Sequence, residues 1–127
     1  MAEAEQQFVV STEKSLNMRL AGNGSAVIVA ALKPMTIVHV TGKANAAGYG
    51  EAFVRGWLGT DDKTLYCDSF SPQNSAVDAV ILHRPAFQAE GAQDVFGRQP
   101  GIVRGWVYLA YLMDAFEASK KPSFIHA

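Results

Sequence analysis

Up to residue 87 the chain consists of short apolar runs, many with alternating polar positions, separated by glycine- and proline-containing turns. This is the pattern of β-strands. Apolar side chains alternate loosely at Leu16, Met18 and Leu20, and turn residues follow at 22–24. Further strands are expected wherever apolar and β-branched residues gather between turns: at 26–32, at 35–41, from Glu51 onward after a loop at 42–50, and at 76–87.

The run AVIVAAL at 26–32 is apolar on both faces and is broken by Pro34. Strands with this composition are covered on both sides. The cover would come either from a second layer of the same chain or from another subunit.

The stretch EAFVRGWLGTDDKTLYCDSF at 51–70 predicts a hairpin with Asp61 and Asp62 at the centre of its turn. Since side chains alternate across a strand, pairing outward from this turn sorts them onto two faces. One face carries matched pairs of rings and of opposite charges: Phe53–Phe70, Arg55–Asp68 and Trp57–Tyr66. The other face is small and mostly apolar: Val54, Gly56, Leu58, Leu65, Cys67 and Ser69. A slip of one residue would break every match, so the register is well specified.

The segment 101–121 predicts a long C-terminal helix. Apolar residues recur at the helical three–four spacing, at Ile102, Trp106, Leu109, Met113 and Phe116. Lys120 and Lys121 suit a helix C-terminus, Pro122 stops the helix, and Gly105 is a cost within it. A short helix is also expected around Ala92–Phe96.

The predicted helix is apolar around most of its circumference, and a helix of that kind is buried on most of its circumference. A small sheet covers only one side, so we expect another subunit to cover the remainder. The residues expected at this interface are Trp106, Val107, Tyr108, Leu109, Tyr111, Leu112, Met113 and Phe116. The fold class expected is α+β: one domain, 1–127, with an antiparallel sheet of about five strands, a sandwich or partial barrel, and one long C-terminal helix packed on it.

The tetrapeptide VRGW occurs twice, at 54–57 and at 103–106. The first copy lies in an alternating segment and the second in the predicted helix. We therefore interpret the match as coincidence.

Composition narrows the function classes. The chain has 127 residues, of which 49% are hydrophobic and 18% charged, which is typical of a packed single domain. Its net charge of −1 argues against binding nucleic acid through phosphate neutralisation. The start of the chain does not resemble a secretory signal, and no apolar run is long enough for a membrane helix. We expect a soluble protein, cytoplasmic or within a viral particle.

Motifs that carry chemistry are few. The sequence has no phosphate-binding glycine loop, nucleophile elbow or zinc-protease motif, and its three histidines, His39, His83 and His126, have no metal-ligand spacing. We expect no metal and no cofactor. The single cysteine, Cys67, is expected to be buried and inert.

Two alternatives use the predicted hairpin face. In an enzyme or ligand-binding domain, His39 would act as a base oriented by Asp68 or Glu51, while Tyr66 and Arg55 place a small anionic substrate. In a single-stranded nucleic-acid binder, bases would stack on the aromatic face, which comprises Phe53, Trp57, Tyr66 and Phe70. Against both, Arg55 and Asp68 are expected to pair with each other, and the rings are expected to pack beneath the C-terminal helix.

The leading hypothesis is a non-enzymatic, self-associating structural subunit of a larger assembly, of the kind that builds virus or phage particles. Excess apolar surface and the absence of catalytic motifs favour it. Its expected partners are copies of itself and other assembly subunits; nucleic acid is disfavoured as a partner, and no membrane is expected.

Overall fold

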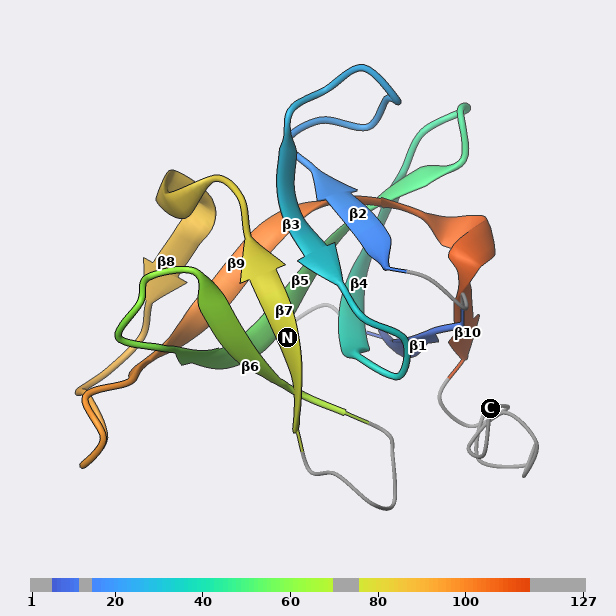
Figure 1. Cartoon of the computed structure of the whole chain (residues 1–127). Helices are drawn as coiled ribbons and strands as arrows, with labels where there is room; N and C mark the ends of the chain where they lie inside the picture. Colours follow the sequence, from blue (N-terminus) through green and yellow to red (C-terminus); the bar gives the residue numbers. More distant parts are fainter. Residues whose placement is uncertain (1–5, 12–14, 70–75, 115–127) are drawn as a thin grey trace.

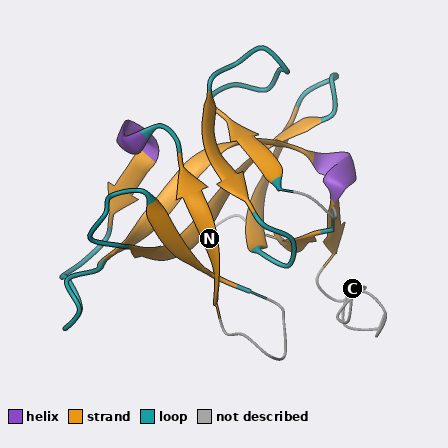
Figure 2. Ribbon diagram, in the orientation of Figure 1, coloured by secondary structure: helices purple, strands orange, loops and turns teal. Residues whose placement is uncertain are grey.

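A computed structural model of the chain describes residues 6–11, 15–69 and 76–114 (Figure 1). These residues form ten β-strands and two short 3₁₀ helices, η1 (Arg84–Ala86) and η2 (Leu109–Tyr111) (Figure 2). The strands are β1 (Gln6–Val10), β2 (Leu16–Arg19), β3 (Ile28–Leu32), β4 (Ile37–Ala44), β5 (Tyr49–Leu58), β6 (Thr64–Asp68), β7 (Ala76–Ile81), β8 (Phe87–Ala89), β9 (Gln99–Tyr108) and β10 (Leu112–Asp114).

Six of these strands close into an antiparallel barrel in the order β5–β6–β7–β3–β2–β9. The barrel closes because β9 pairs with β5 along its whole length, from Tyr49 opposite Tyr108 to Leu58 opposite Gln99. Closure pairs backbone groups that an open sheet would leave exposed at its edges. Strands β4, β1 and β10 continue the sheet from β5, and β8 continues it from β9.

The long strands β5 and β9 pair with each other along one edge. Along the other edge, each pairs with two different strands. The first half of β5 pairs with β4 and its second half with β6. In the same way β9 pairs with β8 near its start and with β2 near its end. At these branch points β4 and β8 continue the sheet outside the barrel, whereas β6 and β2 belong to the barrel.

The barrel interior is filled by side chains that alternate with outward-facing ones, as expected for a small barrel. The largest fully buried side chains of the core cluster are aliphatic: Met18, Leu32, Leu58, Leu65, Val10, Val29, Val38, Val54, Val103 and Val107. The apolar run at 26–32 contributes to this interior, because Val29, Ala30 and Leu32 of β3 are fully buried. The same chain therefore supplies most of the cover that this run requires.

The predicted hairpin register is confirmed near its turn. Gly56 lies opposite Cys67, Trp57 opposite Tyr66, and Leu58 opposite Leu65. At the turn, the Asp61 carboxylate accepts hydrogen bonds from the backbone N–H groups of Lys63 and Thr64, each at 2.9 Å. These bonds favour the ionised carboxylate and lower the Asp61 pKa to about 2.

Beyond Gly56 the two strands separate, which the sequence did not predict. Strand β6 ends at Asp68, and Ser69 forms a bridge with Thr36. Phe53 instead lies opposite His39 of β4. The expected partner of Phe53, Phe70, lies outside the described residues.

The predicted α+β fold is wrong, because residues 101–114 form β9, η2 and β10 instead of a helix. The segment is apolar on all sides for a different reason. Inward-facing Val103 and Val107 fill the barrel, while Ile102 on the opposite face is also buried. Residues 115–121 of the predicted helix lie outside the described residues.

Glycine explains why 101–108 suits a strand. A Cβ on Gly105 would lie 2.6 Å from Cγ of Met18 and 2.7 Å from the backbone oxygen of Arg19. A residue without a side chain is therefore needed where β2 crosses closely over β9. The glycine that counted as a cost within a helix is a requirement of barrel closure.

Both copies of VRGW occupy equivalent positions on the paired strands β5 and β9. Val54 lies opposite Val103, and both are fully buried. Arg55 and Arg104, the next residue of each copy, are exposed on the outer face. The repeat, interpreted from sequence as coincidence, marks two strands with the same inward–outward pattern.

Other boundaries differ in detail. The loop expected at 42–50 is shorter, because β4 extends to Ala44 and β5 begins at Tyr49. The strand expected at 76–87 is divided by η1, whose second residue is Pro85. The short helix expected around Ala92–Phe96 is absent; Asp94 there accepts backbone hydrogen bonds from Phe96 and Arg98 in a turn.

Candidate functional site

The outer face of β5 is organised around the ring of Phe53, which is only 4% exposed although it points away from the barrel interior. His39, directly opposite on β4, stacks on it with ring centroids 4.9 Å apart. The guanidinium groups of Arg55 and Arg104 each lie 5.4 Å from its centroid. Cation–π contacts of this kind hold the guanidinium groups over the ring, and the arginine side chains shield the ring from water.

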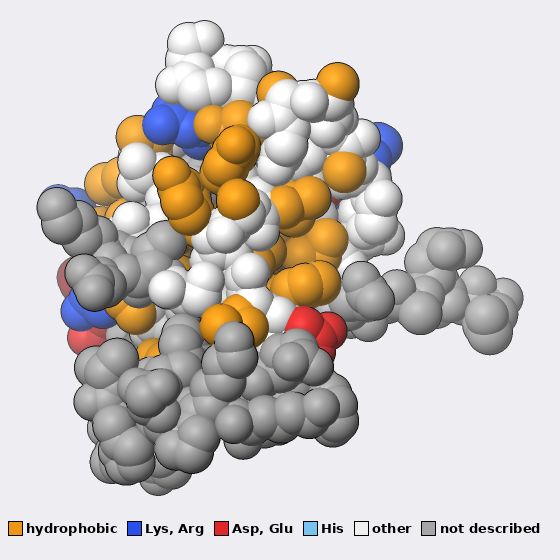
Figure 3. Space-filling model, turned by 90° about the vertical axis from the view of Figure 1, so that its right-hand side faces the viewer, with side chains coloured by type: hydrophobic (Ala, Val, Ile, Leu, Met, Phe, Trp, Pro, Cys, Tyr) orange, Lys and Arg blue, Asp and Glu red, His pale blue; other side chains and the backbone are white. Residues whose placement is uncertain are grey.

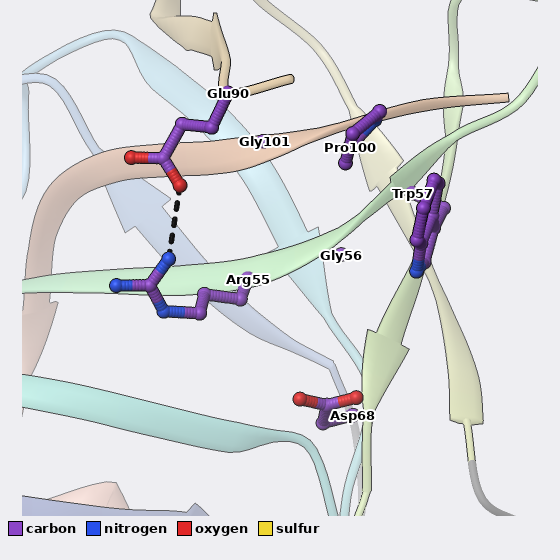
Figure 4. Close-up of a pocket in the computed structure, with 7 residues that line it drawn as sticks. All are labelled: Arg55, Gly56, Trp57, Asp68, Glu90, Pro100 and Gly101. Atoms are coloured by element: carbon purple, nitrogen blue, oxygen red, sulfur yellow. Dashed lines mark hydrogen bonds and ion pairs between the residues drawn. The ribbon is translucent and has the colours of Figure 1, made fainter. Parts of the chain in front are cut away.

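A pocket of about 260 Å³ is lined by Arg55, one of these two arginines (Figure 4). Its floor is the Gly56–Gly101 pair of β5 and β9. Its walls are the side chains of Arg55, Trp57, Asp68, Glu90 and Pro100. Arg55 donates a hydrogen bond of 2.9 Å to Glu90, and the two side chains are 50% and 41% exposed.

The structure brings together two of the four residues in the enzyme hypothesis. Arg55 and Asp68 line the same pocket, but the ion pair of Arg55 is with Glu90 and not, as predicted, with Asp68. His39 stacks on Phe53, and Tyr66 lies 5.6 Å from the Arg98 guanidinium, so neither is a pocket wall. Glu51, the other proposed partner of the base, lies within hydrogen-bond distance of Thr41. The hypothesis of a base, an orienting carboxylate and an anion site stays a prediction.

The aromatic face is only partly the surface that the sequence predicts. Trp57 is 38% exposed and Tyr66 is half-buried, whereas Phe53 is covered by its cationic neighbours and His39. The C-terminal helix expected above these rings is absent from the described residues. A continuous stacking platform therefore does not form between Phe53 and Trp57.

A second candidate site lies at one end of the barrel. We call it the tyrosine tip and define it as residues 20–27, 44–49 and 108–111. Tyr108 contacts the rings of Tyr49 and Tyr111, with centroids 5.3 Å and 5.2 Å away. Its three segments are joined by hydrogen bonds, from the Asn45 amide to the Gly22 carbonyl at 2.7 Å and from the Leu109 backbone N–H to the Gly48 carbonyl.

The tyrosine tip is exposed and carries no charged residue. None of its residues is Asp, Glu, Lys, Arg or His. Three of its large side chains are about half exposed: Leu20 at 53%, Val27 at 54% and Tyr111 at 48%. On the side of the barrel that bears η2 and β10, hydrophobic side chains gather at the centre and charged ones lie at the margins (Figure 3).

The structure places most of the predicted interface residues at or near this tip, on β9, η2 and β10. Tyr111 is exposed, and five others are half-buried: Trp106, Tyr108, Leu109, Leu112 and Met113. Val107 is fully buried in the barrel, so it cannot contact another subunit. Phe116 lies outside the described residues.

Comparison of the chain with protein-family models, with curated proteins and with solved structures finds no match. Within the described residues, no group of three or more His, Cys, Asp or Glu side chains is placed to hold a metal ion. No helix in this part of the chain has the length and apolar character needed to cross a membrane.

Proposed function

We propose that the protein is a non-enzymatic structural subunit that associates with copies of itself through the tyrosine tip. The observation that carries this proposal is an exposed surface built from three segments that contain no charged residue and meet only in the folded barrel. The nearest charge is the Arg19 guanidinium, which donates a hydrogen bond to the Ala26 carbonyl. Protein interfaces are depleted of charged residues at their core and enriched in tyrosine and tryptophan. Exposed loops without any such role are usually more polar.

The absence of charge favours contact between identical copies. In a two-fold contact the same surface of both copies meets, so an excess of one charge on it would face the same excess on the other copy. A surface whose three segments contain no charged residue reduces this cost. Tyrosine also loses little conformational entropy on binding, since its side chain has only two rotatable bonds.

The tip is also held in shape before any partner binds. Asn45 accepts hydrogen bonds from the backbone N–H groups of Ala47 and Tyr49, and Asn23 accepts one from Ser25. A Cβ on Gly48 would lie 3.0 Å from the Tyr108 ring, so the hairpin packs closely on it. Ordered loops lower the entropic cost of association.

Replacement of Tyr111 by glutamate tests the proposal. A glutamate within the contact would be desolvated with no opposite charge in the tip to pair with it, so we expect Tyr111→Glu to reduce the solution mass to that of one chain. Light scattering at matched concentrations measures this mass. Val95→Glu is the control: Val95 is 92% exposed in the loop between β8 and β9, outside the tip.

The native chain and Val95→Glu should then share the mass of a defined oligomer. Circular dichroism and thermal unfolding confirm that both variants keep the fold. A native chain with the mass of a monomer throughout the concentration range contradicts the proposal, as does a Tyr111→Glu variant that keeps the native mass.

A further inference from the structure

The pocket lined by Arg55 and Trp57 is separate from the tyrosine tip. It is lined by Arg55, Gly56 and Trp57 in the second half of β5, whereas the tip includes Tyr49 at the start of that strand. Its volume of about 260 Å³ is smaller than that of typical pockets for drug-sized ligands, which begin at about 300 Å³. The pocket therefore suits one small chemical group.

The charges around the pocket favour a cation. Arg55 is already held by Glu90 at 2.9 Å and by the Phe53 ring, so its positive charge is compensated. Asp68 lines the pocket and forms no ion pair with any residue in the described ranges. Asp78 adds a second carboxylate on β7, opposite Tyr66.

The charges of these two carboxylates also affect a buried group, the Cys67 thiol. Burial, with smaller contributions from the charges of Asp68 and Asp78, raises the pKa of the Cys67 thiol to about 12. Strands β6 and β7 thus carry two carboxylates on this side, while the nearby Arg98 guanidinium, 5.6 Å from the Tyr66 ring, is paired with Asp94.

Trp57 supplies the remaining recognition element. Figure 4 shows its ring on one side of the pocket, across from the Arg55–Glu90 pair, with the Asp68 carboxylate below. Trp57 is 38% exposed, so a ligand can reach it. Indole is the aromatic ring that attracts cations most strongly, and its negative face disfavours anions.

We propose that this pocket binds a guanidinium group, which stacks on Trp57 and donates hydrogen bonds to Asp68. Guanidinium is planar, so it matches both a ring face and the two oxygens of a carboxylate. The group would come from a free small molecule or from an arginine side chain of a peptide. This proposal does not depend on self-association through the tip.

The test is a titration of the native chain with methylguanidinium chloride, followed through the two tryptophan indole N–H signals in ¹H–¹⁵N NMR spectra. Trp57→Phe assigns the signals. We expect a saturable shift of the Trp57 signal, little change at Trp106, and no saturable shift with sodium chloride or sodium acetate. A capped Gly-Arg-Gly peptide is the second probe. If the peptide binds, the site accepts arginine side chains. If methylguanidinium binds and the peptide does not, the site is specific for a free small molecule.

Asp68→Asn should weaken binding about fivefold, the factor expected when a partly exposed charge pair is lost. Asp78→Asn removes the same charge from the neighbouring strand without altering the pocket wall, so it should weaken binding less. Both side chains are exposed, and spectral dispersion confirms that each variant is folded. A Trp57 signal that does not saturate, a preference for acetate, or equal effects of the two variants would overturn the proposal.

Discussion

Replacing Gly101 by alanine should lower the free energy of unfolding by about 3 kcal/mol, the upper range for overpacking a core. The Cβ of alanine would lie 2.5 Å from Cζ of Phe87 and in contact with the backbone oxygen of Gln88. Both partners belong to β8, which pairs with β9 at this point. The backbone oxygen cannot move without loss of this pairing, so the strain is not relieved by a side-chain rotation alone.

Gly24→Ala is the matched control for this experiment. Its Cβ would meet only Tyr49 Oη at 3.6 Å, an ordinary van der Waals distance. Its stability should stay within about 0.5 kcal/mol of the native value. Urea unfolding of both variants measures the difference, and a Gly101→Ala variant as stable as Gly24→Ala would show that β8 does not pack on β9 as described.

Cys67 should react with iodoacetamide about a thousandfold more slowly in the native chain than in the unfolded chain at about pH 8. The thiol is fully buried in the barrel. Burial is the main cause that raises its pKa from the ordinary 9.0 to about 12, with Asp68 and Asp78 adding to it. Because the thiolate is the reactive form, a pKa higher by this amount lowers the reactive fraction by about that factor at any pH below 9.

Mass spectrometry of quenched samples measures this rate. The same chain unfolded in guanidinium provides the fast reference, and Thr60→Cys adds an exposed thiol at the β5–β6 turn as an internal comparison. The Thr60→Cys thiol should be alkylated at close to the unfolded rate while Cys67 stays unmodified. Rapid alkylation of Cys67 in the folded chain would contradict the assignment of this face to the barrel interior.

The sequence predicted well where the interacting residues are close in the chain. The register around Trp57 and Tyr66 followed from the chemistry of facing pairs and a turn of known residues. The prediction from sequence was wrong where a strand distant in the chain pairs with the hairpin. Nothing local to Phe53 indicates that β4 takes over the edge of β5 and brings His39 against the ring.

The error at 101–114 has a related cause. Ile102, Trp106 and Leu109 follow a helical spacing. A strand buried on both faces is apolar at nearly every position, however, so apolar residues fall at helical spacings within it as well. What favours the strand over the helix is pairing with β5, because β9 pairs with β5 along its entire length. The paired copies of VRGW and the glycines at 101 and 105 were the available signals for a strand.

The candidate sites were predictable only in part. The sequence indicated a contact surface around Tyr108 and Tyr111, but not that residues 20–27 and 44–49 join it, since that depends on barrel closure. It indicated an ion pair for Arg55 but assigned the wrong partner. Glu90 is 35 residues away in sequence and follows a strand, β8, that the pattern did not separate from its neighbours.

The most direct test of the central claim is to record backbone amide NMR shifts of the native chain over a wide range of dilution. If the tyrosine tip is the contact between copies, concentration-dependent shifts should concentrate in residues 20–27, 44–49 and 108–111. The β5–β6 turn at Thr60–Lys63, which joins the opposite end of β5 to β6, should not change. Shifts confined to other surfaces, or none at any concentration, would contradict the assignment of this surface to self-association.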